Sequence, residues 1–186
     1  VGGKVAGIGA YAANKKVTLK ATPNKGYVFA GWYKDALFET PCDSTLVDYR
    51  TPSYAYVMGE DDTQFYARFV TKEDEADYKM GIALYPLDTP TLEIDELVYK
   101  AGEAILPIWV MVDSLTLPKV TVKGLPKGMK FDAKTFTISG TPTQPGDYVV
   151  YIEAVNASKS CVAVAEVYFT ITHYDAHGLH QDEEKV

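Results

Sequence analysis

Carboxylate side chains form the densest group of metal-ligating residues in this sequence. Glu73, Asp74, Glu75 and Asp77 all lie within the segment TKEDEADYKMG. Calcium takes oxygen ligands of this kind, so it is the one cofactor that the segment could select. No ordered D-x-D-x-D-G loop is present, however, and like charges close together in sequence repel one another and stay hydrated. We therefore expect residues 71–79 to be a solvated acidic linker, with calcium binding as the alternative.

The three histidines are the other potential metal ligands, and they lie together near the C-terminal end of the sequence. His173, His177 and His180 would share one face of a helix, as ligands of a zinc ion can. Gly178 disfavours that helix, so residues 173–186 are expected to be a flexible tail or the start of a further module. A Ser-His-Asp or Cys-His triad would need one of these histidines, and the sequence therefore predicts no catalytic residue and no enzyme.

Aromatic side chains of the first seventy residues are the third group that could do chemistry. Exposed rings stack on the apolar faces of sugars, so Tyr33, Tyr54 and Tyr56 are candidate ligand-binding residues. A domain of ~70 residues also needs large side chains to fill its core. By strand alternation about half of these rings should face inward, and Trp32 is expected to be structural. The rings that could contribute to such a sugar-stacking platform are Tyr27, Phe29, Trp32, Tyr33, Tyr54, Tyr56, Tyr66 and Phe69.

Composition and charge argue against several other classes of function. The chain carries 25 acidic and 18 basic residues, a net charge of −7, and no basic stripe that would favour nucleic-acid binding. The longest apolar run, AILPIWVMV, is shorter than the ~18 residues of a membrane span, so no membrane insertion is expected. Cys42 and Cys161 fall in different predicted domains, and we expect both to be buried free thiols.

Alternating side chains predict a mostly β protein with two domains, at residues 1–70 and 80–172. The segment KKVTLKAT places Val17, Leu19 and Ala21 on one face and its lysines and threonines largely on the other. The segments SYAYVM and TQFYARFV, joined by the acidic turn GEDD, are predicted to form a hairpin.

The second domain shows the same period of two. Its last predicted strand, CVAVAEVYFTIT, has a face of small and large apolar residues that suits packing against a second sheet. That face consists of Ala163, Ala165, Val167, Phe169 and Ile171. In ISGTPTQPGDY, Pro142 and Pro145 each lack a backbone donor, so this stretch is predicted to be a corner between strands.

The second domain resembles the immunoglobulin-like, cadherin-like domain that is repeated in bacterial cell-surface proteins. Residues 124–156 contain that family's pattern G-L-P-x-G, then I-S-G-T-P, then G-x-Y-x-V and A-x-N. Phe136 departs from the pattern, which usually has a glycine at this point. The resemblance extends over about residues 80–172 and implies an immunoglobulin-like β-sandwich.

The first domain resembles the internalin B-repeat-like bacterial surface repeat. Residues 2–69 contain G-x-V-x-G-x-G-x-Y, followed by V-T-L-x-A-x-P-x-x-G-Y-x-F-x-G-W-Y and then Y-A-R-F. This resemblance implies a small β-grasp-like repeat domain. Neither family implies a catalytic residue, so none is carried over to this sequence.

Together the two resemblances imply a non-catalytic module pair of a secreted bacterial surface protein, acting as adhesive or spacer (stalk) domains. The alternative is a glycan-binding accessory module of a surface enzyme or nutrient-capture protein. We expect an extracellular protein or glycan as partner, a location at the bacterial cell surface, and a monomer within a longer chain. An intramolecular bond between a lysine and an asparagine or aspartate, as in some surface modules, is a further alternative for either domain.

Overall fold

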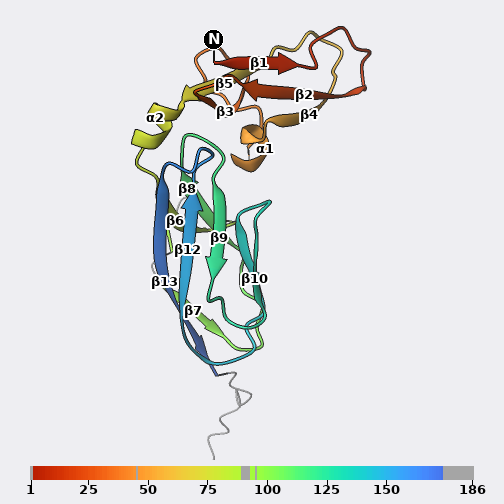
Figure 1. Ribbon diagram of the computed structural model, residues 1–186. Coiled ribbons are helices and arrows are strands. Elements are labelled where there is room, and N and C mark those ends of the chain that lie inside the picture. Colours follow the sequence, from red (N-terminus) through yellow and green to blue (C-terminus); the bar gives the residue numbers. More distant parts are fainter. Residues whose placement is uncertain (1, 45, 89–92, 95, 174–186) are drawn as a thin grey trace, which may run out of the picture.

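The structure is a computed structural model that describes residues 2–44, 46–88, 93–94 and 96–173. Its described strands fall into two groups with separate sheets, which we call the first domain (strands within 3–71) and the second domain (strands within 81–172). The first domain lies at one end of the second, and the molecule is elongated (Figure 1). The predicted mostly β class is confirmed.

The first domain contains five strands in two small sheets and one short helix, α1. The three-stranded sheet has the order β1-β2-β4, and β3 pairs with β5 in the other sheet. The predicted hairpin is therefore wrong, because β4 pairs with β2 instead of with β5. The bounds are β1 Gly3–Ala6, β2 Lys16–Pro23, β3 Tyr27–Tyr33, α1 Leu46–Arg50, β4 Ser53–Val57 and β5 Tyr66–Thr71.

The core of the first domain lies between these two sheets. The alternation predicted for β2 is confirmed, since Val17, Leu19 and Ala21 are buried while the intervening residues are exposed. Leu19 and Ala21 cluster with Phe29 and Trp32 of β3, a strand that is buried along nearly its whole length. Burying several large rings in so small a domain compensates for its limited volume.

A helix occupies the segment that was expected to be a solvated linker. Helix α2, Lys72–Asp77, follows β5 directly, and the hydroxyl of Thr71 caps it by accepting from the backbone N–H of Asp74 at 3.0 Å. The same hydroxyl donates to the Asp74 carboxylate at 2.7 Å. Capping of this kind satisfies an orphan donor at the helix start. The chain therefore passes from one domain to the next through ordered structure.

The second domain is a sandwich of two four-stranded sheets. One sheet has the order β10-β11-β8-β6, and the other, which we call the front sheet, has the order β7-β13-β12-β9. All pairings are antiparallel except that of β7 with β13, which is parallel. The bounds are β6 Gly81–Pro86, β7 Leu97–Lys100, β8 Ile108–Asp113, β9 Lys119–Lys123, β10 Met129–Asp132, β11 Thr137–Gly140, β12 Gly146–Val155 and β13 Val162–Thr172.

The sandwich core is built from alternate residues of both sheets. Val150, Ile152 and Phe169 of the front sheet are fully buried against Val110 and Ile138 of the opposite sheet. The face predicted for the last strand is confirmed, since the residues of β13 that point inward are the more buried ones. The immunoglobulin-like β-sandwich is thereby confirmed as the fold of this domain.

Candidate functional site

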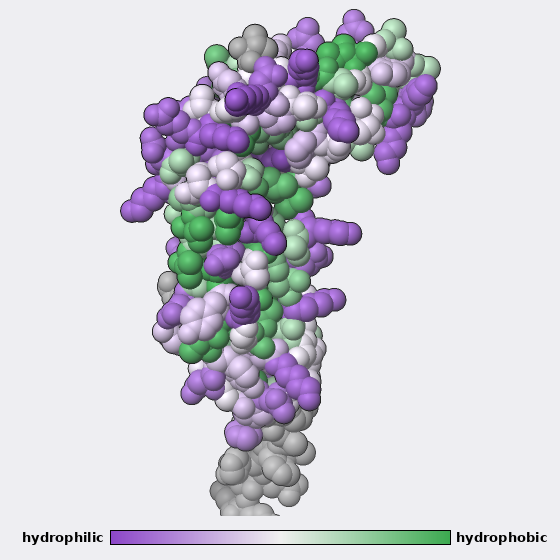
Figure 2. All heavy atoms as spheres, in the orientation of Figure 1, coloured by the Kyte–Doolittle hydropathy of each residue, from purple (hydrophilic) through white to green (hydrophobic). Residues whose placement is uncertain are grey.

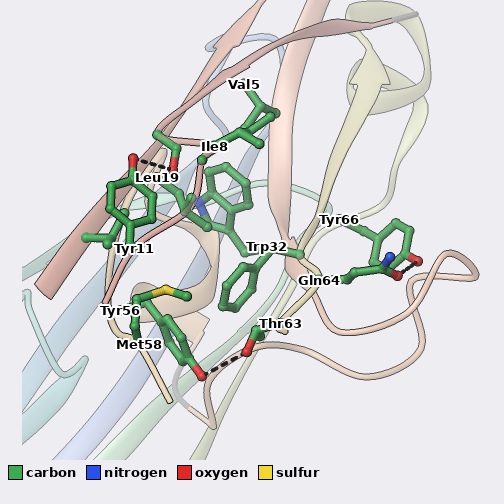
Figure 3. Close-up of a pocket in the computed structure, with 14 residues that line it drawn as sticks. Val5, Ile8, Tyr11, Leu19, Trp32, Tyr56, Met58, Thr63, Gln64 and Tyr66 are labelled. Atoms are coloured by element: carbon green, nitrogen blue, oxygen red, sulfur yellow. Dashed lines mark hydrogen bonds between the residues drawn. The ribbon is translucent and has the colours of Figure 1, made fainter. Parts of the chain in front are cut away.

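A pocket opens at one edge of the first domain, where the loop after β1 faces the segment between β4 and β5 (Figure 3). Its volume is about 390 Å³, which lies within the range of small-molecule sites. The walls are mainly apolar and aromatic. They are formed by Val5, Gly7, Ile8, Gly9, Tyr11, Val17, Leu19, Trp32, Tyr56, Met58, Thr63, Gln64, Phe65 and Tyr66.

Trp32 lies beneath the pocket, and its neighbours hold it in place. Trp32 lies in the middle of the labelled side chains in Figure 3, and its indole nitrogen donates to the carbonyl of Thr51 at 3.1 Å. Phe29 packs on the Trp32 ring at 5.3 Å between centroids. Because Trp32 is fully buried, it supports the pocket from beneath and leaves little surface of its own for a ligand.

The rim of the pocket carries the polar groups, and these bond to one another. The Tyr11 hydroxyl donates to the carbonyl of Gly7 at 3.2 Å. The Tyr56 and Thr63 hydroxyls are 3.4 Å apart. A third hydroxyl, that of Tyr66, donates to Gln64 at 2.9 Å. Because each rim hydroxyl keeps further bonding capacity, a ligand could add to these pairs without breaking them.

Of the three candidate aromatic residues, Tyr56 alone lines this pocket. Tyr33 is buried, and its ring packs edge-on against Phe38 and Tyr49. Tyr54 is half-buried; its hydroxyl donates to the Cys42 carbonyl at 3.4 Å, and burial raises the pKa of its phenol. The structure therefore does not bring these tyrosines together into one platform.

The four candidate carboxylates on α2 also have different environments. Glu73, Asp74 and Asp77 are exposed, whereas Glu75 is only 1% exposed. Across the part of the chain that the structure describes, no group of three or more His, Cys, Asp or Glu side chains is placed to hold a metal ion. The expectation of a uniformly solvated segment fails at Glu75, because the second domain supplies donors that the local sequence does not show.

Glu75 is hydrogen-bonded to two loops of the second domain. The Thr116 hydroxyl donates to its carboxylate, and so does the backbone N–H of Ser158, at 3.2 Å. The side-chain amide of Asn156 donates to the backbone carbonyl of Glu75 at 3.4 Å. A buried carboxylate is tolerated only where donors compensate for lost hydration, so these contacts make α2 part of the joint between the domains.

Arg50, the last residue of α1, forms the other half of the joint. Its Nη1 donates to the carbonyl of Ser114 and to that of Thr116, the latter at 3.2 Å. Val47 of the same helix packs against the core of the second domain. Among the described side chains, Arg50 Nε and Ser114 Oγ are the buried polar atoms without a hydrogen-bond partner.

Tyr78 extends the joint beyond α2. Its hydroxyl donates to the Asp113 carboxylate at 2.6 Å, and this bond, together with burial, raises the pKa of the phenol. The Cys161 thiol donates to the Tyr78 carbonyl at 3.5 Å. Residues 47–50 of the first domain and residues 75–78 of the connector therefore both contact the second domain.

The cysteines, lysines and histidines are the remaining candidates from the sequence. Cys42 is a buried free thiol, and burial raises its pKa to about 11; Cys161 is also free but only partly buried. Every lysine in the described ranges is exposed, which leaves no buried amine there for an intramolecular lysine bond. His173 is exposed, while His177 and His180 lie outside the described residues.

Sequence reasoning missed the residues of the joint. Arg50, Thr116, Asn156 and Ser158 come from loops or the end of a five-residue helix, and none belongs to a motif of known chemistry. One signal was present, since Asn156 closes the A-x-N pattern. Its carboxamide oxygen accepts from the backbone N–H groups of Ser160 and Cys161 at 2.9 and 3.1 Å, which shapes the loop that meets Glu75.

Comparisons with known proteins agree with this division of the chain. Residues 1–73 match the family model described as "Divergent InlB B-repeat domain", and residues 88–174 match the one described as "Putative Ig domain". A search of curated proteins finds no match. No helix among the described residues is long and apolar enough to cross a membrane.

Two solved structures from Bacteroides fragilis NCTC 9343 are similar to part of the chain. One, described as a putative alpha-galactosidase, is 26% identical over 41% of this chain and 16% of its own, with a TM-score of 0.37. The other, described as a putative alpha-galactosidase/melibiase, is 24% identical with the same coverage and a TM-score of 0.36. This chain thus spans about one sixth of the length of either protein. The chain is thus similar to a divergent InlB B-repeat domain over residues 1–73 and to an immunoglobulin-like domain over residues 88–174.

Proposed function

We propose that this chain is a non-catalytic spacer (stalk) or adhesive module pair of a secreted bacterial surface protein. Both of its domains belong to families of repeat or immunoglobulin-like modules, and no catalytic family matches. A location at the cell surface, outside the cell, follows from the same proposal, and the chain would act as a monomer within a longer protein.

The joint between the domains is the observation that carries the spacer proposal. A flexible linker would let the two modules swing independently, which is the default for small interfaces within a chain. Here the connecting helix contributes its one buried carboxylate to the contact with the second domain, and Arg50 bonds to a loop of that domain. Two separate helices thus contact the second domain, and these contacts would oppose bending at the joint, as a spacer of fixed length requires.

The path of the chain also suits a spacer. Strand β1 begins at one end of the elongated molecule and β13 ends at the other (Figure 1). A module that takes in the chain at one end and releases it at the other adds its full length to a string of modules. The exposed faces along the way remain free for adhesion.

The test is whether the two domains tumble as one body. We expect ¹⁵N relaxation to give both domains the same rotational correlation time in the unmodified chain. Glu75→Ala should separate the two values and broaden the distance distribution from small-angle X-ray scattering. Glu73→Ala is the matched control, since this exposed carboxylate lies on the same helix. Different correlation times for the two domains of the unmodified chain would refute the rigid spacer.

Glycan binding is the second candidate, and the pocket of the first domain favours it. Its apolar floor and hydroxyl-bearing rim could hold a ring with one apolar face, with Tyr56 as the contact. A titration with neutral monosaccharides, followed by amide chemical shifts, should then move signals of residues 5–11 and 56–66. The shifts should disappear in Tyr56→Ala. If no sugar moves these signals, the pocket is not a glycan site.

A further inference from the structure

The exposed aromatic side chains of the described residues lie together on the second domain. Tyr151 is 47% exposed and Tyr168 is 66% exposed. Every other Tyr, Phe and Trp in the described ranges is buried or half-buried, including those of the aromatic-rich first domain. Single exposed rings are common on protein surfaces, but here the two that are exposed share one face of one sheet.

Strand register makes these two tyrosines neighbours. Tyr151 of β12 lies opposite Glu166 of β13, and Tyr168 lies opposite Val149. The two rings therefore start from diagonal positions on adjacent strands, roughly 7–8 Å apart, a separation that aromatic side chains can span. Their positions on the inner two strands of the front sheet place them in the middle of its outer face.

Hydrogen-bonding side chains lie beside both rings. Lys123 of β9 lies opposite Tyr151 on its other side, so Lys123, Tyr151 and Glu166 form one row across three strands. The hydroxyl of Tyr168 donates to Glu166 at 3.4 Å. In the next row, Thr170 donates to Asp147 at 2.9 Å. Val149 and Val164, 40% and 63% exposed, lie on the same face, which therefore combines aromatic rings, hydrogen-bonding groups and apolar side chains.

The sandwich core does not require these rings. Residues that alternate with them, Val150, Ile152 and Phe169, point inward and are fully buried. Since the tyrosines project from the opposite face, truncating them opens no cavity in the core. Their large exposed surface therefore has no packing role within the described chain.

The charges on the outer face select among occupants. Asp147, Glu153 and Glu166 lie on the two central strands, and Lys119 and Lys123 lie beside them on β9. Charges of both signs are therefore interspersed, and a strongly charged polymer meets no face of the opposite sign. A neutral polymer with hydroxyl groups suits this face, because carboxylates accept from hydroxyls and ammonium groups donate to them. Figure 2 shows hydrophobic and hydrophilic residues interleaved over this side of the second domain.

From this arrangement we propose that the outer face of the front sheet binds a neutral oligosaccharide chain. The rings of Tyr151 and Tyr168 stack on the apolar faces of sugar rings, and Glu166 and Lys123 bond to the neighbouring hydroxyls. The inference rests on the glycan-binding alternative and not on the spacer proposal, whose test is the correlation time of the two domains. It places the glycan on a flat strand face of the second domain instead of in the pocket of the first.

Affinity electrophoresis of the whole chain provides the test. Native gels would contain one neutral polysaccharide each (mannan, galactan, xylan or mixed-linkage β-glucan), and a polygalacturonate gel would serve as the anionic comparison. We expect at least one neutral polymer to retard the chain, and polygalacturonate not to do so. Tyr151→Ala/Tyr168→Ala should weaken retardation by about tenfold or more. Tyr151→Phe/Tyr168→Phe keeps both rings and should retain most of the binding.

Two controls distinguish binding at this face from binding in the pocket and from a loss of folding. Tyr56→Ala should leave retardation unchanged, and the alanine pair should keep the melting temperature of the unmodified chain. If the alanine pair does not fold, amide chemical shifts of the unmodified chain with an oligosaccharide of the retarding polymer decide, and they should move on β12 and β13. The proposal is overturned if no neutral polymer retards the chain, if only polygalacturonate does, or if Tyr56→Ala abolishes binding while the alanine pair retains it.

Discussion

The hydroxyl of Thr116 donates to the carboxylate of Glu75, across 41 residues of sequence and from one domain to the other. Thr116 also accepts from the backbone N–H of Ala157 at 3.2 Å, so its hydroxyl links both loops of the second domain that meet α2. Because Thr116 is fully buried, water cannot replace either partner. The carboxylate therefore fixes the helix and both loops relative to one another.

A double-mutant cycle on this pair should show strong coupling. Thr116→Val removes the donor while nearly keeping the volume, and Glu75→Ala removes the charged acceptor. A buried hydrogen bond to a charged group contributes about 1.5–3 kcal/mol, so we expect a coupling energy in that range from urea unfolding. The comparison pair is Thr121 and Glu153, which lie opposite each other on β9 and β12 but on the outer face. Their cycle should give less than about 0.5 kcal/mol. Equal coupling in the two cycles would mean that burial of Glu75 does not strengthen the bond.

Phe136 has a buried side chain, which stabilises the domain, and a left-handed backbone conformation, which destabilises it. Substitution should reveal which contribution to the free energy of unfolding is larger. Its φ is +54°, in the left-handed region, yet its side chain is 4% exposed and stacks on Phe131 at 6.3 Å. Left-handed backbone costs about 1–2 kcal/mol, whereas loss of a buried phenylalanine costs about 3–5 kcal/mol. Phe136→Gly should therefore destabilise the second domain by about 2 kcal/mol, although the family's usual residue here is glycine.

Asn14 is the matched control for Phe136→Gly. Its φ is +64°, and its side chain is exposed. Asparagine tolerates this backbone conformation, so Asn14→Gly should change the free energy of unfolding by less than about 0.5 kcal/mol. Denaturant midpoints of both variants give the comparison. A stabilised Phe136→Gly variant would show that backbone strain outweighs burial of the ring.

The strands could be predicted from the sequence because their signal is local. Alternation in KKVTLKAT and in VAVAEVYFTIT is visible without any knowledge of partners, and both segments are strands with the expected buried face. The pairing of β4 with β2 could not be predicted in this way, since the acidic turn GEDD favours a local hairpin and long-range pairing leaves no local mark. The existence of strands was thus easier to predict than their order.

The surroundings of the candidate functional residues also depend on long-range contacts. Composition alone treats Glu75 like Glu73, and only the loops of the second domain distinguish them. The aromatic residues are most frequent in the first domain, so the sequence pointed to a binding site there, but most of those rings fill the core of that domain. The alternation of DYVVYIEAV already puts Tyr151 on the face with Glu153, so the exposed ring was visible in the sequence. The position of Tyr168 next to Tyr151 follows only from the register of β12 and β13, which the sequence does not show.

Cys42 should resist alkylation in the folded chain. Thiolate is the reactive form, and burial raises the pKa of this thiol from 9.0 to about 11. At pH 8, iodoacetamide should modify Cys42 only after unfolding in urea, as read by intact mass and peptide mapping. Rapid modification of Cys42 in the folded chain would show that the thiol is accessible.

The same thiol predicts a pH dependence of stability. Between pH 9 and 11 the unfolded thiol loses its proton while the folded one keeps it, so the folded state binds more protons there. The free energy of unfolding must then fall as pH rises through this window, and this group adds no slope below pH 9. Other groups titrate in the same range, so the slope of the unmodified chain is compared with that of Cys42→Ala. If the free energy of unfolding fell equally steeply from pH 9 to 11 in both proteins, burial would not raise the pKa of Cys42.

Gly128, the second glycine of G-L-P-x-G, should be the least replaceable glycine of its turn. Its φ is +94°, and a Cβ at this position would lie 2.0 Å from the carbonyl oxygen of Thr141. That oxygen cannot move freely, because two hydrogen bonds hold the segment that follows β11. The Thr141 N–H donates to the Gly128 carbonyl at 3.1 Å, and the Thr143 N–H donates to the Lys127 carbonyl at 2.9 Å. Gly128→Ala therefore combines left-handed strain with a backbone clash.

Gly26 is a control that has the left-handed backbone conformation without the clash. Its φ is +87°, close to that of Gly128, but a Cβ there would meet nothing within 4 Å. Gly26→Ala should cost only the backbone term, about 1–2 kcal/mol, whereas Gly128→Ala should cost at least about 2 kcal/mol more, because overpacking adds to the strain. Urea unfolding of both variants, with unchanged m-values, measures the difference. Similar losses would mean that the corner relaxes around a methyl group, and that the glycine is required for its backbone angle alone.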